Sequence, residues 1–244
     1  MSKGTQQQKQ FKILLVGEIC QDVYVYGDVS RISPEAPVPI LKKVSKDCKA
    51  GMSGNVYQNI MKMIRFIDEK SNYQIMRYDI EKDIEALDFK CIDYNKRYDA
   101  VVISDYDKGY VNCNFINEFC EYFKDTQIFV DTKKSNLSSF KNSIIKLNEL
   151  ESRASINLDK TSDIITTLGS RGCQFNNIVY STQPVEVYDV CGAGDVFLAA
   201  LVTRWLETKK IDLALKTANN CAALSVTKLG CYTVSRKEYE SLCV

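Results

Sequence analysis

Two glycines and one aspartate near residue 190 have the spacing of a turn that handles phosphate. Gly192, Ala193 and Gly194 follow a β-rich segment and open an apolar run typical of a helix. The free N–H groups at a helix start, together with the helix dipole, favour an anion, and glycine lets that anion touch the backbone. Phosphate would repel Asp195, so this carboxylate makes sense if it accepts a proton from an attacking hydroxyl. Standing alone, the motif is better interpreted as a glycine-rich turn capped by aspartate.

Seven further segments, in order along the chain, support the phosphate interpretation. Together with the GAGD motif they resemble the PfkB, or ribokinase-like, sugar kinases. The most specific is SRISPEAPVP at residues 30–39, which is similar to the branch that phosphorylates heptose 7-phosphate at its anomeric carbon, the kinase half of the bifunctional ADP-heptose synthase. The likeness covers nearly the whole chain, with interruptions that look like deletions. The seven segments are residues 16–22, 30–39, 51–56, 104–109, 130–134, 147–151 and 228–235.

The resemblance implies an α/β fold with three layers, in which helices flank a mostly parallel sheet and a small β lid is attached. We expect a single domain over residues 1–244, with a flexible start at 1–10 and lid strands at roughly 23–45 and 73–79. In the family the lid covers the sugar and often forms the dimer contact, which implies a possible homodimer through the lid. Composition agrees, since 244 residues with 45% hydrophobic content can bury one substantial core.

Hydrophobic patterning predicts where the elements lie. Pro34, Pro37 and Pro39 separate two exposed strands and fit the edge of a small sheet. Most of the motifs follow a strand, and ligands of open parallel sheets gather at the carboxyl ends of the strands. The expected strands are 11–16, 23–26, 38–44, 74–79, 100–103, 128–130, 144–147 and 164–167, with a hairpin at 174–180, and the expected helices are 54–66, 113–123, 193–206 and 213–226.

The resemblance assigns sugar-phosphate contacts to five positions. Asp22 follows the first strand and resembles the family carboxylate that binds sugar hydroxyls, with a surface turn as the alternative. Gly51 precedes the expected helix that Asn55 opens, and an N-cap is the alternative role for Asn55. Lys108 and Arg31 could neutralise a substrate phosphate.

The resemblance also implies ATP and Mg²⁺. Asn148 and Glu149 match the Asn-x-x-Glu region that, in these kinases, organises water and magnesium around the triphosphate. The pattern is compacted here, so the choice between Glu149 and Glu151 stays open. The remaining nucleotide contacts implied are Thr167, Gly169 and Gly172 at the phosphates and Asn219 at the adenine.

The implied mechanism is in-line phosphoryl transfer from ATP. The γ-phosphate would rest against the N–H groups of residues 192–194, and Asp195 would deprotonate the sugar hydroxyl while a closed lid excludes water. A monovalent cation such as K⁺ is also implied near Asp189. Cys191 stands where the family usually has threonine and lacks a hard oxygen, although backbone carbonyls could still supply the site.

Composition excludes several classes of function. Lys and Arg total 32 against 31 Asp and Glu, so the charge of +1 gives no field for nucleic acid. No run reaches the roughly 18 apolar residues of a membrane span, and we expect a cytoplasmic protein. The chain has no histidine, which excludes catalytic triads, imidazole bases and the usual zinc sites. The cysteines are scattered, and Cys20, Cys173 and Cys221 are expected in the core.

Departures from the family pattern leave two functions open. Met52 replaces a second glycine, and between Ile67 and Gln74 the family carries roughly fifty more residues, with a smaller gap between Glu151 and Asp163. One interpretation is a minimal, active sugar-phosphate kinase. The other is a weak or silent relative that binds a sugar phosphate or acts as a partner subunit. The nucleotidyltransferase half of the bifunctional protein is expected on another chain.

Overall fold

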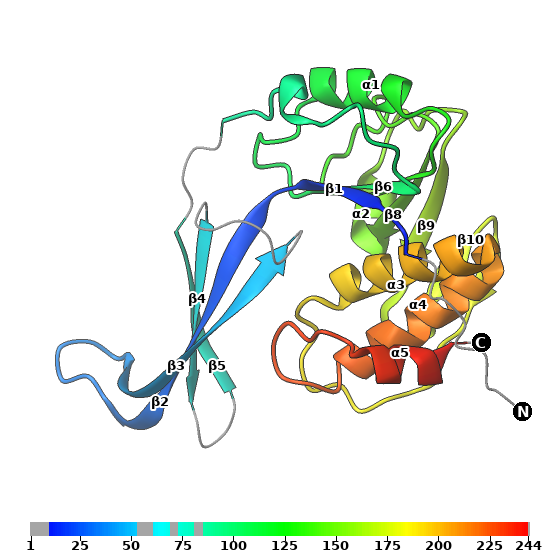
Figure 1. Cartoon of the computed structure of the whole chain (residues 1–244). Coiled ribbons are helices and arrows are strands. Elements are labelled where there is room, and N and C mark those ends of the chain that lie inside the picture. Colours follow the sequence, from blue (N-terminus) through cyan, green and yellow to red (C-terminus); the bar gives the residue numbers. More distant parts are fainter. Residues whose placement is uncertain (1–9, 53–60, 69–72, 81–84, 244) are drawn as a thin grey trace, which may run out of the picture.

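The computed structural model describes residues 10–52, 61–68, 73–80 and 85–243, which form a main sheet with helices on both faces and a smaller sheet beside it (Figure 1). In the main sheet the first five strands pair in parallel and the last two are antiparallel. The order is β1 (Ile13–Gly17), β6 (Ala100–Asp105), β7 (Ile128–Thr132), β8 (Ser143–Asn148), β9 (Asp163–Thr167), β10 (Cys173–Phe175) and β11 (Ile178–Tyr180). The predicted mostly parallel sheet and the hairpin at 174–180 are confirmed.

Helix α1 (Cys113–Tyr122) covers one face of the main sheet, and α3 (Ala193–Thr208) and α4 (Ile211–Ser225) cover the other (Figure 1). Two separate groups of buried side chains, one on each face, make up the core, so the predicted three layers are confirmed. Cys173 and Cys221 are fully buried, as expected. The sequence analysis missed two short helices, α2 (Glu149–Ala154) and α5 (Arg236–Leu242).

Local chemistry explains why α1 forms where it does. Asn112 caps it by accepting a hydrogen bond from the Phe115 amide at 2.9 Å. Phe115, Ile116 and Phe119 repeat at helical spacing and are buried against the sheet. Since β6 and β7 are parallel neighbours, the segment β6–α1–β7 is the predicted crossover unit.

The smaller sheet has four strands and projects away from the helices (Figure 1). Its order is β3 (Pro39–Met52), β2 (Ile19–Ile32), β4 (Met61–Asp68) and β5 (Tyr73–Ile80). Pro39 begins the edge strand, as the proline pattern predicted. We call these four strands the lid sheet. Its base is joined to the body by Tyr24, which is 1% exposed and whose hydroxyl accepts a hydrogen bond from the Cys231 amide at 3.2 Å.

The prediction of a helix over residues 54–66 was wrong for the part that the structure describes. Residues 61–66 belong to β4, which pairs in parallel with β2, and residues 53–60 lie outside the described residues. A short apolar run such as MKMIRF fits both periods, and pairing with the free side of β2 satisfies its backbone as a strand.

Candidate active site

The turn before α3 has the geometry that the sequence predicted. Gly192 takes a left-handed conformation, with φ of 72°, and Asp195 lies in the first turn of the helix. A side chain at Gly194 would meet Lys146, because an added Cβ would lie 2.9 Å from the Lys146 ammonium nitrogen. The space that glycine leaves at this position is therefore occupied by the ammonium group of Lys146.

Lys146 is the most informative residue that the sequence analysis missed. Its ammonium group lies 2.5 Å from Asp131 Oδ2, and both side chains are almost fully buried, at 5% and 6% exposure. The other oxygen, Asp131 Oδ1, has no hydrogen-bond partner among the described residues. A lysine inside the apolar strand 143–148 was the available signal, because a charge in a buried strand needs a partner.

Asp195 faces the same buried pair. The pKa of the Asp195 carboxyl is raised to about 6, mainly by burial and in part by the charge of Asp131. The Tyr106 hydroxyl, which donates a hydrogen bond to Asp195 Oδ1 at 2.9 Å, acts in the opposite direction, as do the charges of Lys146 and Lys133. A carboxyl group with a pKa near 6 is mostly ionised at neutral pH and is still basic enough to accept a proton.

Polar contacts between neighbouring strand ends frame this site. The buried Asp105 at the end of β6 accepts hydrogen bonds from Thr132 Oγ1 at 2.7 Å and from Lys134 Nζ at 3.2 Å. Glu18, which follows β1, is 3% exposed and accepts from the amides of Tyr106 at 2.8 Å and Lys108 at 3.3 Å. The carboxyl ends of β1, β6, β7 and β8 therefore meet at one edge of the main sheet, beside the start of α3.

Asn148 and Glu151 form the N-terminal cap of α2. Asn148 Oδ1 accepts from the Glu151 amide at 2.9 Å, and Glu151 Oε2 accepts from the Asn148 amide at 2.7 Å. Glu151 also pairs with Lys133, which lies in the electrostatic field of Asp195. Glu149 instead pairs with Arg153 and Arg171, at 2.9 Å and 2.7 Å. Of the two glutamates, Glu151 is the one linked to the residues around Asp195.

The other residues assigned to nucleotide lie at the adjoining end of the sheet. Thr167 pairs in register with Asn148 across β8 and β9. Gly172 has φ of 90°, and an added Cβ would lie 3.1 Å from Asn219 Nδ2. Asn219 is buried and donates to the Tyr180 carbonyl at 2.7 Å. Gly169 also has a positive φ, of 60°, and no atom within 4 Å of an added Cβ. Their roles in nucleotide binding stay predictions.

Asp189 joins two loops beside the turn. One of its carboxylate oxygens accepts from the Cys191 amide at 2.9 Å and the other accepts from the Gly230 amide at 2.8 Å. These contacts hold the segment before α3 against the loop that also receives Tyr24 of the lid sheet. Each oxygen is thus already engaged, and a monovalent cation at Asp189 stays a prediction.

The residues assigned to the sugar are distributed along the lid sheet and the loop after β6. Asp22 and Gly51 lie near the base of the lid sheet, where Cys20 pairs with Gly51. Arg31 is exposed near the outer end of β2, roughly 30 Å further along that strand than Asp22, at the rise of an extended chain. Lys108 is exposed after β6. Asn55 lies outside the described residues.

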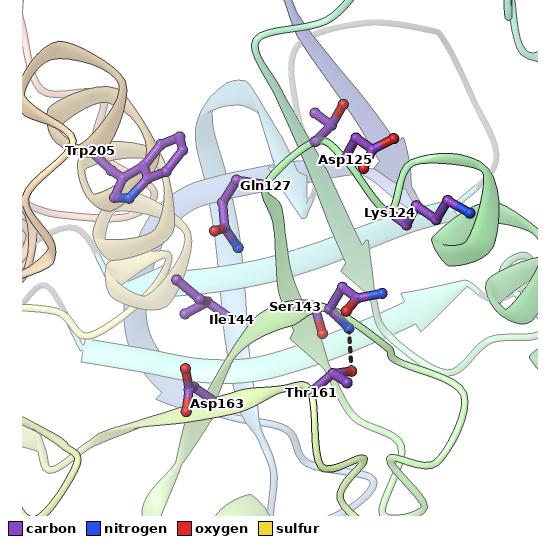
Figure 2. A pocket seen from close by; sticks show the side chains of 10 residues that line it. Lys124, Asp125, Gln127, Ser143, Ile144, Thr161, Asp163 and Trp205 are labelled. Carbon is purple, nitrogen blue, oxygen red and sulfur yellow. Dashed lines mark hydrogen bonds between the residues drawn. The ribbon is translucent and has the colours of Figure 1, made fainter.

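A hollow of about 460 Å³ lies at the opposite, amino-terminal edge of the main sheet (Figure 2). Gln127, Ser143 and Asp163 line it where β7, β8 and β9 begin, and Trp205 of α3 closes one side. None of the residues assigned to sugar or nucleotide lines this hollow.

The described part of the chain lacks two further features, a direct metal-binding cluster and a membrane-spanning helix. No three acidic, cysteine or histidine side chains there are arranged to hold a metal ion directly. No helix in that part is long and apolar enough to span a membrane.

Comparisons with known proteins agree with this geometry. Residues 137–238 match the pfkB family carbohydrate kinases. The chain is 27% identical to the bifunctional protein HldE of Campylobacter curvus over 306 residues, covering 96% of this chain and 65% of the relative. It is 26% identical to HldE of Haemophilus influenzae, covering 99% of this chain and 65% of that protein. The chain thus spans less than two thirds of the length of these relatives.

Solved structures share the fold. Ribokinase of Thermotoga maritima has a TM-score of 0.69 at 17% identity, with 96% of this chain and 99% of the ribokinase covered. Phosphofructokinase-2 of Escherichia coli in complex with potassium has a TM-score of 0.71 at 13% identity, with coverages of 96% and 98%. The predicted ribokinase-like fold is therefore confirmed.

Proposed function

We propose that the chain, whose residues 137–238 match the pfkB family carbohydrate kinases, transfers the γ-phosphoryl group of ATP to a hydroxyl group of a sugar phosphate. The reaction forms a bond between the sugar oxygen and the γ-phosphorus and breaks the bond from that phosphorus to the bridging oxygen of ADP. The hydroxyl proton goes to Asp195, and ADP leaves. Phosphoryl transfer of this kind depends mainly on positioning and on electrostatic stabilisation.

One observation carries the proposal. Asp195, with its pKa raised to about 6, directly follows a glycine turn, and the buried ammonium of Lys146 lies beside Gly194 of that turn. The turn supplies positive potential for a terminal phosphate, and the carboxylate supplies a base at the same place. Lys133, close enough to influence Asp195, adds a second positive charge.

The residues at this edge also fit magnesium held through water. The carboxylates of Glu149 and Glu151 in α2 are the hard oxygen donors that Mg²⁺ prefers, and they follow β8 directly. When bound with ATP, magnesium neutralises charge on the phosphates. We favour Glu151 over Glu149 for this role, because Glu151 pairs with Lys133, which is close enough to Asp195 to influence its ionisation.

Heptose 7-phosphate is our proposed acceptor. The support is the similarity to the HldE proteins over 96% to 99% of this chain, together with the SRISPEAPVP segment of the lid sheet. The alignment to the Campylobacter protein extends over 306 residues, more than the 244 of this chain, as expected for a relative shortened by deletions. We further propose a cytoplasmic location, where ATP is available, and a homodimer formed through the lid sheet.

The proposal is tested by release of ADP with heptose 7-phosphate, ribose and fructose 6-phosphate as acceptors. We expect turnover that depends on the sugar, is highest with heptose 7-phosphate, and falls by about 10³-fold in Asp195→Asn. The matched control is Asp163→Asn, which makes the same change at the exposed start of β9 and should keep full turnover. Equal background in wild type and Asp195→Asn would instead favour the silent relative.

One feature favours that second candidate. Lys146 fills the space beside Gly194, and its pairing with Asp131 could seat a bound phosphate without any transfer. Calorimetry with heptose 7-phosphate in the absence of ATP, combined with the ADP-release assay, distinguishes the two. Binding of the sugar phosphate with no ADP released under any acceptor would identify a binding protein.

A further inference from the structure

Tyr106 contacts the proposed base without belonging to the phosphate turn. It follows β6, and its hydroxyl donates to Asp195 Oδ1 at 2.9 Å across the edge of the sheet. The contact joins two segments that are 89 residues apart in the chain. A phenol is a directional donor, so the hydrogen bond engages one oxygen of the carboxylate and fixes the orientation of the other.

The backbone of Tyr106 is held as firmly as its ring. Its amide donates to Glu18 Oε2 at 2.8 Å, and the amide of Lys108 donates to Glu18 Oε1 at 3.3 Å. The next residue, Asp107, donates its amide to Asp105 Oδ1 at 3.0 Å. Burial raises the pKa of Glu18, while the backbone hydrogen bonds from Tyr106 and Lys108 lower it. The buried Glu18 carboxylate thus fixes the backbone of the loop that carries Tyr106, because it accepts hydrogen bonds from two amides of that loop.

Charged groups on or after the neighbouring strands β7 and β8 influence the ionisation of Asp195. Asp131 in β7 opposes its ionisation, whereas Lys146 in β8 and Lys133 after β7 favour it. Lys133 also lies 5.7 Å from the centre of the Tyr106 ring. Among these neighbours Tyr106 is the hydrogen-bond donor to the carboxylate, and it therefore acts on the orientation of Asp195 as well as on its charge.

We infer that Tyr106 is a positioning residue for the proposed phosphoryl transfer. Its hydroxyl holds Asp195 Oδ1, keeps the carboxylate ionised, and turns Oδ2 toward the acceptor hydroxyl. Glu18 supports this role through the loop backbone. The inference rests on the proposed function, because it concerns the same base.

The first test measures the carboxyl group itself. Carbon-13 labelled aspartate gives a resonance for Asp195 that is identified by its loss in Asp195→Asn, and its titration is followed between pH 4 and 9. In Tyr106→Phe we expect its pKa to rise by about one pH unit, because a hydrogen bond that favours the charged form is removed. Tyr122→Phe is the matched control, since this exposed hydroxyl donates at 2.9 Å to the Tyr94 carbonyl in a different part of the protein.

The second test measures turnover against pH. The acidic limb of kcat should move to higher pH by the same amount in Tyr106→Phe and stay in place in Tyr122→Phe. A uniform loss of rate with an unmoved limb and an unmoved pKa would show a merely structural role and overturn the inference. If Tyr106→Phe does not fold, wild-type protein made with fluorotyrosine, a stronger donor, should show a lower pKa for Asp195, and an unchanged value overturns the inference.

The two proposals can fail separately. If Asp195→Asn abolishes turnover but Tyr106→Phe leaves the pKa unchanged, the proposed function stands and the role of Tyr106 is wrong. If no acceptor gives turnover while the pKa of Asp195 still responds to Tyr106→Phe, the proposed function is wrong and the link between the two side chains is real.

Discussion

The two edges of the main sheet differ in how they bury charge. The amino-terminal edge has an open hollow of about 460 Å³, lined by exposed groups such as Thr161 and Asp163 (Figure 2). The carboxyl edge has buried opposite charges, Asp131 with Lys146, next to a carboxyl group of raised pKa. Taking charge out of water is costly, so the concentration of buried charge at the carboxyl edge is our reason for placing the proposed site there rather than at the hollow.

The backbone explains why the charges gather at that edge. Parallel strands bring their carboxyl ends together, and α3 presents the N–H groups at its start to the same place. At the other edge, polar groups such as the Asn142 amide and Thr161 Oγ1 form a hydrogen bond with each other, at 2.9 Å.

The largest effect on stability is expected at the buried pair. Lys146→Met leaves the Asp131 carboxylate buried without its partner and should reduce the free energy of unfolding by about 3–5 kcal/mol. The double variant Asp131→Leu/Lys146→Met should recover most of that loss. Denaturation in urea measures both. A small loss of unfolding free energy in Lys146→Met would mean that the buried Asp131 carboxylate does not depend on its partner charge, contrary to our description of the carboxyl edge.

Gly172 should be nearly as sensitive. An added Cβ would lie 2.0 Å from the Tyr180 carbonyl oxygen, and φ of 90° with ψ of −127° is accessible only to glycine. We expect Gly172→Ala to cost about 3 kcal/mol or more. Gly169→Ala, where no atom lies within 4 Å, should cost only about 1 kcal/mol. Equal losses in thermal unfolding would contradict this account of the strand end.

Asp195→Asn should stabilise the protein at neutral pH. Because the pKa in the folded state is about 6 and that in the unfolded state is near 4, folding opposes ionisation of this group. The cost is fully present above pH 6 and disappears as pH falls toward 4, since the folded state then takes up a proton. We expect a gain of about 2 kcal/mol at pH 8 and little gain at pH 4, measured by urea denaturation. A gain that does not depend on pH would be inconsistent with a raised pKa.

The amino-terminal edge should show the smallest effects. Asp163 is exposed at the start of β9, so Asp163→Asn should change the free energy of unfolding by less than about 0.5 kcal/mol and leave turnover unchanged. Thermal unfolding and ADP release measure the two quantities. A large loss of turnover in Asp163→Asn would contradict the proposal that phosphoryl transfer takes place at the carboxyl edge.

The sequence predicted what depends on local pattern. The turn at 192–195, the strands that precede the motifs and the hairpin at 174–180 are set by glycine positions and by hydrophobic period, and each is confirmed. The residues that the sequence analysis missed depend on contacts across the fold. Lys146 meets Gly194, and Tyr106 meets Asp195, only because β6, β8 and α3 end at one edge.

One wrong prediction and one missed helix have physical causes. The run at 61–66 fits both a helix and a strand, and pairing with β2, which no local pattern encodes, decides for the strand. Asn148 and Glu151 have the spacing of a capping box as well as that of the family motif, and the sequence analysis did not foresee α2. The structure links Glu151, through Lys133, to the residues around Asp195, whereas the sequence left the choice between Glu149 and Glu151 open.

We propose that the carboxyl edge of the main sheet binds the terminal phosphate of ATP. The most direct measurement is the shift of backbone amide resonances when a non-hydrolysable ATP analogue with Mg²⁺ is added to the whole chain. We expect the largest shifts at Gly192, Ala193 and Gly194 and none at residues 124–127, which line the opposite hollow. Large shifts at 124–127 with none at 192–194 would contradict the account.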